Sequence, residues 1–136
     1  MSETIKCFTI LPSSSERLYH AWLDSQEHSA FTGSTAEIDP TPGGSFTAWD
    51  GYIEGRTLEL EPYRRIVQAW RTTEFPAGSP DSRLEIQIDA VEGGTQITLI
   101  HSQIPDGQGT QYAQGWEDYY FKPMREYFSS PGAEKQ

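Results

Sequence analysis

Arg56 is the residue whose type and position in this sequence could most directly bind a charged molecule. It belongs to a segment, residues 52–61, that predicts a β-strand, and alternation places it on the same face as Leu58. If residues 62–64 form a three-residue hairpin loop, Trp70 of the next strand lies opposite Arg56. An unpaired guanidinium on such an apolar face would be very costly, whereas its planar fork of donors suits a carboxylate. We therefore predict that Arg56 anchors an acidic ligand.

Other arrangements of Arg56 stay open at this point. Its side chain could lie at a strand end that curls into water, or it could be held by an ion pair. The acidic neighbours available for such a pair are Glu54, Glu117 and Asp118. A β-bulge at Gly55 would turn the side chain to the opposite face of the sheet. The assignment of Arg56 therefore depends on the strand register.

His101 is a second candidate for chemistry. It ends a predicted strand, residues 95–101, and faces the predicted C-terminal helix, where its near-neutral pKa would suit proton transfer. The alternative is a histidine that makes one hydrogen bond in a packed core. His20 and His28 fall in two predicted helices, and no histidine has the spacing of a metal site. Because nucleophile elbows, phosphate loops and dinucleotide fingerprints are also missing from the sequence, we predict no catalytic residue, no metal and no cofactor.

Aromatic and apolar residues are expected to form the two walls of a pocket between the sheet and the C-terminal helix. Such a wall with few polar tips is typical of a site for a small apolar or amphipathic molecule. The alternative is that these side chains meet and fill the core. The predicted ligand-binding residues are Trp49, Tyr52, Arg56, Trp70, Leu99 and His101 from the sheet, and Tyr112, Trp116, Tyr120 and Met124 from the helix.

The elements that position these residues follow from hydrophobic periodicity and turn residues. Strands are predicted over residues 4–11, 36–39, 46–49, 52–61, 66–71, 84–89 and 95–101, and helices over residues 16–23, 25–31 and 108–128. Pro123 should kink the last helix near its middle, because proline has no N–H and clashes with the carbonyl of Tyr119. This order predicts an α+β helix-grip fold. In it a curved antiparallel sheet of six to seven strands wraps around a long C-terminal helix, with two short helices after the first strand.

Composition limits the classes of protein that fit. The 136 residues suit one domain, predicted over residues 1–128, with a disordered tail over residues 129–136. Acidic residues outnumber basic ones 20 to 10, and a formal charge of −10 disfavours nucleic acid and anionic membranes as partners. Cys7 is the single cysteine, so no intrachain disulfide can form. Because no secretory signal or membrane span is evident in the sequence, a cytoplasmic protein is expected.

Four segments together resemble a known family. They are PGGSFTAWDGYIEGRTLELEPYRRIVQAW from residue 42, LYHAWLDSQEHSAF from residue 18, GGTQITLIHSQIP from residue 93 and GWEDYYFKPMREYF from residue 115. In order and spacing they are similar to the activator of Hsp90 ATPase homologue family of the START-like (SRPBCC, Bet v-like) superfamily. The resemblance covers most of residues 3–128. It implies a helix-grip fold, a ligand pocket and a link to the stress response. It also implies a chaperone as an alternative partner, while an enzyme that uses the same pocket is a second alternative.

Overall fold

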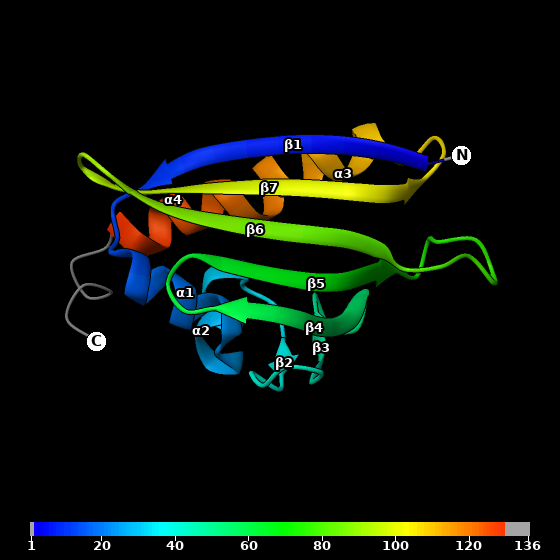
Figure 1. The fold of residues 1–136 in the computed structure, drawn as a ribbon, viewed down its shortest axis with the longest axis horizontal. Coiled ribbons are helices and arrows are strands. Elements are labelled where there is room, and N and C mark those ends of the chain that lie inside the picture. Colours follow the sequence, from blue (N-terminus) through cyan, green and yellow to red (C-terminus); the bar gives the residue numbers. More distant parts are fainter. Residues whose placement is uncertain (1, 130–136) are drawn as a thin grey trace.

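One antiparallel sheet curves around a C-terminal helix (Figure 1). The computed structural model describes residues 2–129. Its elements are β1 (Ser2–Leu11), α1 (Ser15–Leu23), α2 (Ser25–Thr32), β2 (Glu37–Ile38), β3 (Ser45–Ala48), β4 (Ile53–Glu61), β5 (Arg65–Thr72), β6 (Ser82–Val91), β7 (Gly94–Pro105), α3 (Gly109–Gly115), the π-helical segment η1 (Trp116–Phe121) and α4 (Lys122–Ser129). Within the described residues the sheet has seven strands in the order β1-β7-β6-β5-β4-β3-β2. The predicted helix-grip architecture is confirmed.

The strand pattern explains which face of the sheet is covered. In β6, Leu84, Ile86 and Ile88 are buried, and the residues between them point to the opposite face. The covered face carries the C-terminal helix, which lies behind β1, β7 and β6 in Figure 1. Burial of alternate apolar side chains against a helix supplies the main favourable term for this packing.

The two short helices begin and end where their capping residues place them. The Ser14 side chain accepts a hydrogen bond from the Arg17 N–H at 3.1 Å at the start of α1. Asp24 caps α2 in the same way, through the Glu27 N–H at 2.8 Å. Gly33 ends α2 in the left-handed conformation with a φ of 80°, which suits glycine because it has no Cβ.

The C-terminal helix changes its hydrogen-bond pattern just before Pro123. Through η1 the backbone adopts the wider π-helical turn, and the Lys122 N–H bonds the carbonyl of Glu117. A π-turn is one way in which a helix accommodates a residue that lacks its own N–H. The hydrogen bonding of the helix therefore changes next to Pro123, while the predicted kink stays a prediction. Of the predicted tail, Ser129 still belongs to α4 and the remainder lies outside the described residues.

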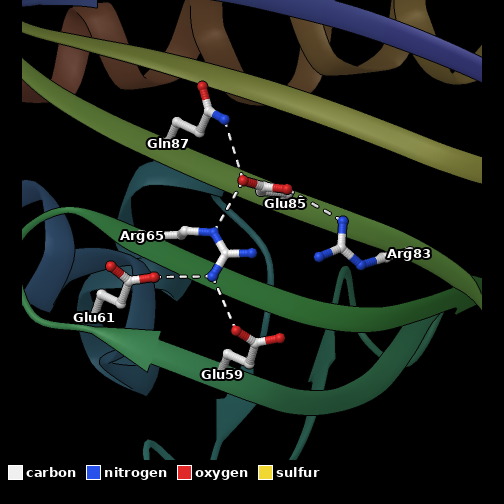
Figure 2. Close-up of polar contacts among 6 residues, drawn as sticks. All are labelled: Glu59, Glu61, Arg65, Arg83, Glu85 and Gln87. Carbon is white, nitrogen blue, oxygen red and sulfur yellow. Dashed lines mark hydrogen bonds and ion pairs between the residues drawn. The ribbon is translucent and has the colours of Figure 1, made fainter.

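The outer face of the sheet carries a network of polar side chains (Figure 2). Its members are Glu59, Glu61, Arg65, Arg83, Glu85 and Gln87. Arg65 donates to Glu59, Glu61 and Glu85 at 2.9 Å each, and so connects β4, β5 and β6. The hydrogen bond from Gln87 and the contact with Arg65 lower the pKa of Glu85 to about 2. The network therefore keeps the Glu85 carboxylate charged and links three neighbouring strands.

Candidate functional site

A cavity of about 460 Å³ opens between the C-terminal helix and the sheet. Two loops complete it, one between β3 and β4 and one after β5. Among the described residues, eleven line the cavity and seven of these are aromatic. The lining residues are Trp49, Tyr52, Ile53, Trp70, Glu74, Gln111, Tyr112, Gly115, Trp116, Tyr119 and Tyr120. The interior is therefore mostly apolar, with a few polar groups.

Six of the ten predicted site residues line this cavity. They are Trp49, Tyr52, Trp70, Tyr112, Trp116 and Tyr120. Leu99, His101 and Met124 are fully buried and belong to the core around the cavity. The core alternative is therefore right for these three residues. Arg56 is exposed and does not line the cavity.

Arg56 points away from the cavity because the register of β4 differs from the predicted one. Gly55, not Arg56, pairs with Trp70, and Arg56 pairs with Ala69. The cause is a register shift between Thr57 and Glu59, where β4 carries one extra residue. Such a β-bulge reverses which side chains face the core on one side of it. The prediction that Arg56 faces an apolar pocket is wrong. The observed bulge lies between Thr57 and Glu59 and not at Gly55, the position considered in the sequence analysis.

His101 supports the cavity wall from behind. The indole N–H of Trp116 donates to its Nδ1 at 3.2 Å, so Nδ1 is an acceptor. Its Nε2 lies 2.8 Å from the Ser82 hydroxyl, which itself donates to the Trp70 carbonyl at 2.6 Å, so Nε2 carries the proton. Burial lowers the pKa of His101 to about 3. The imidazole of His101 is thus neutral, fully buried and hydrogen-bonded at both ring nitrogens. It positions Trp116 and offers no proton to the cavity.

A second buried histidine orients another lining residue. His28 Nδ1 lies 2.9 Å from the Trp22 carbonyl and must donate to it, which leaves Nε2 to accept from the Tyr120 hydroxyl at 2.8 Å. Burial lowers the pKa of His28 to about 4. Sequence reasoning placed His28 in α2 but gave it no role, because its partner is far away in the chain.

Glu74 is the charged group of the cavity, and sequence reasoning missed it. It follows β5 in a stretch that composition predicts as a surface loop. The Tyr52 hydroxyl donates to Glu74 Oε2, and burial together with this bond raises the pKa of Tyr52 to about 12. The next residue, Phe75, is buried against Trp70 with ring centroids 6.2 Å apart, and this contact anchors the loop at the cavity.

Strained backbone shapes the mouth of the cavity. Trp49 and Asp50 have φ values of 53° and 56°, in the left-handed region that side chains other than glycine rarely adopt. This conformation places the Trp49 ring 5.7 Å from that of Tyr119, which is 59% exposed. Strain of this kind persists only where the surroundings enforce it and is concentrated at ligand sites.

Residues 12–129 match the family described as activator of Hsp90 ATPase homolog 1-like protein. The chain belongs to this family. Activator of 90 kDa heat shock protein ATPase homolog 1 from Homo sapiens is 30% identical over 116 residues, which are 85% of this chain and 34% of the human protein. The chain spans about one third of the length of the curated relatives it matches. The resemblance seen in the sequence is thus confirmed.

Solved structures similar to this member of the activator family share its fold. An Hsp90 activator from Plasmodium falciparum has a TM-score of 0.82 at 24% identity, over 96% of this chain and 98% of that chain. A protein from Chromobacterium violaceum has a TM-score of 0.74 at 27% identity, over 93% of this chain and 97% of that chain. The likeness covers nearly the whole chain and shows a shared fold.

The cavity of this activator-family chain offers mainly aromatic contact surface. Within residues 2–129 no three histidine, cysteine, aspartate or glutamate side chains gather closely enough to hold a metal ion. No helix in the same part of the chain is long and apolar enough to cross a membrane. The arrangement offers a large aromatic surface, one carboxylate and a few hydroxyl and amide groups.

Proposed function

We propose that this protein binds a small, largely apolar molecule in the cavity between its sheet and its C-terminal helix. The observation that supports the proposal is the cavity of about 460 Å³ with its mainly aromatic lining. Such a surface gains about 25 cal/mol for each Å² of apolar area that a ligand covers, before the costs of association. The volume falls within the range of about 300–1,000 Å³ that is typical of small-molecule sites.

Gly115 allows a direct test, because a side chain can be added there without removing any aromatic group. It lines the cavity in α3, and a Cβ at this position would meet only Tyr119, at 3.8 Å. We expect Gly115→Leu to weaken binding of the neutral probe N-phenyl-1-naphthylamine by about tenfold or more, because leucine would occupy the apolar space. Binding is followed by the emission of the probe and by the fluorescence of the lining tryptophans.

The matched control is Gln114→Leu, which adds the same side chain at the preceding, exposed position. Gln114 does not line the cavity, so this variant should bind the probe like the unaltered protein. Equal affinity in the Gly115→Leu variant would contradict the proposal, since the probe would then bind elsewhere.

A second candidate function is the binding of an Hsp90 chaperone. It is favoured by the name of the human relative, an activator of the 90 kDa heat shock protein ATPase that is 30% identical over 85% of this chain. If this chain shares that partner, purified Hsp90 should bind it in isothermal calorimetry. The Gly115→Leu variant should bind Hsp90 unchanged, because it alters the cavity and not the outer surface. Failure of Hsp90 to bind would remove this candidate without affecting the pocket proposal.

A further inference from the structure

The charge of the cavity is the opposite of the one predicted from the sequence. No lysine or arginine among residues 2–129 lines it, and Glu74 brings a carboxylate to its wall. Arg71, three residues before Glu74, donates to Asp81 at 2.8 Å and to the Ser79 carbonyl at 2.9 Å. Its guanidinium also lies 5.3 Å from the centre of the Phe75 ring. Arg71, the cation nearest to Glu74 in sequence, is therefore already paired with Asp81.

The Glu74 side chain has no basic partner among the described residues. Within the described residues it forms no ion pair, and the Tyr52 hydroxyl is the side chain that donates to it, at Oε2. The other carboxylate oxygen, Oε1, receives no hydrogen bond from residues 2–129. The bond from Tyr52 fixes the direction of the carboxylate, because a phenol that stays neutral can donate but cannot cancel the charge.

The aromatic lining adds to the same preference. The faces of aromatic rings carry partial negative charge because of the ring quadrupole, so they attract cations. Sites for quaternary ammonium groups are accordingly often lined by tryptophan and tyrosine. Three tryptophans and four tyrosines line this cavity. Three of these rings pack against one another, with the centroids of Trp70 and Trp116 5.4 Å apart and those of Trp116 and Tyr120 4.9 Å apart. Side chains that are already packed lose little entropy when a ligand covers them.

We propose that the cavity selects a small organic cation, a tertiary or quaternary ammonium group on an apolar body, with Glu74 and the aromatic rings around the charge. The inference rests on the proposed function, since it names the class of ligand for the same cavity. The formal charge of −10 of the whole chain favours the approach of cations in addition. An acidic ligand would bring its charge toward Glu74 and meet no basic side chain on the described wall.

Three phenylalkyl probes of similar length but different charge test this selection. They are trimethyl(3-phenylpropyl)ammonium, its neutral isostere with a tert-butyl group in place of the ammonium, and 5-phenylpentanoate. Calorimetric titrations at physiological salt should show the cation binding about tenfold more tightly than the neutral isostere, because the rings and Glu74 attract only the cation. The acid should bind most weakly of the three.

Glu74→Gln tests the carboxylate while it keeps the shape of the side chain and an acceptor for Tyr52. We expect this variant to bind the ammonium probe about threefold more weakly and the neutral isostere unchanged, as suits a partly solvated charge. Asp89→Asn is the matched control, because it removes the same charge from an exposed position near the β6–β7 turn, at the opposite end of the sheet from the loop after β5 (Figure 1). It should bind all three probes like the unaltered protein.

The possible outcomes separate this inference from the proposal on which it rests. Equal affinity for the cation and its neutral isostere would overturn the cation selection and leave the apolar pocket supported. Tighter binding of the acid would overturn it as well. An unchanged preference in the Glu74→Gln variant would overturn the role of Glu74. If neither these probes nor N-phenyl-1-naphthylamine bind, the pocket itself is rejected.

Discussion

Replacing Trp116 with alanine is expected to lower the free energy of unfolding by about 3–5 kcal/mol, as for other large aromatic side chains removed from packed cores. Trp116 lines the cavity but is only 3% exposed. Its ring packs between those of Trp70 and Tyr120, and its N–H is the donor to His101 Nδ1. Truncation would leave a void and an unsatisfied buried acceptor, and both effects reduce stability.

Urea denaturation of the variant and of a matched control measures this effect. Tyr119→Ala removes an aromatic ring from the neighbouring part of the same helix, at an exposed position. The control should lose less than about 1 kcal/mol, since exposed side chains contribute little to stability. If both variants lost equally little, Trp116 would be the wall of a solvent-filled cleft and not a part of the packed core.

The helix side of the cavity could be predicted from the sequence because helical periodicity is local. Tyr112, Trp116 and Tyr120 recur at intervals of four residues, which places them on one face of a helix whatever it packs against. All three line the cavity. Met124 continues the same face, but it lies in the core beyond the end of the cavity. Periodicity therefore predicts the face of a residue and not its depth.

The sheet side could be predicted only in part, because strand register is sensitive to a single residue. The sequence TLELE at residues 57–61 alternates in a way that favours an inward Leu58 and Leu60. The bulge instead buries Thr57 and leaves Leu58 exposed, and Arg56 turns outward with it. Nothing in the local pattern marks the extra residue, since the bulge is favoured by packing across the sheet.

The loop after β5 shows a second limit of sequence reasoning. Its proline and glycine residues correctly predict an irregular segment. The contact of Phe75 with Trp70, 6.2 Å between ring centroids, and with Tyr112, 6.1 Å, brings Glu74 to the cavity. Tyr112 is far from the loop in the chain, so the contact exists only after folding. The charge of the cavity was therefore not predictable from local patterns.

The stability of the fold is expected to decrease as the pH falls from 6.5 to 4.5. The pKa values of His28 and His101 are lowered by burial to about 4 and about 3, against about 6.5 for an unfolded histidine. In this interval the unfolded chain binds protons at both positions and the folded chain does not, so acid favours the unfolded state. Each histidine should contribute up to about 1.4 kcal/mol per pH unit to the loss.

Substitution of one histidine at a time measures how much that histidine contributes to the pH dependence of the unfolding free energy. His101→Gln keeps an acceptor for Trp116 and a donor for Ser82 but cannot be protonated, so the pH dependence of the unfolding free energy should fall to about half. His28→Gln removes the other buried imidazole and should lower the pH dependence by a similar amount. The pKa of Glu85, lowered to about 2, affects stability mainly below the chosen interval, where carboxylates of the unfolded chain become protonated. The contradicting outcome is an equal slope of unfolding free energy against pH in the His101→Gln variant and the unaltered protein. It would mean that His101 takes up its proton as readily in the folded state as in the unfolded one. The contacts with Ser82 and Trp116 would then not hold the imidazole neutral.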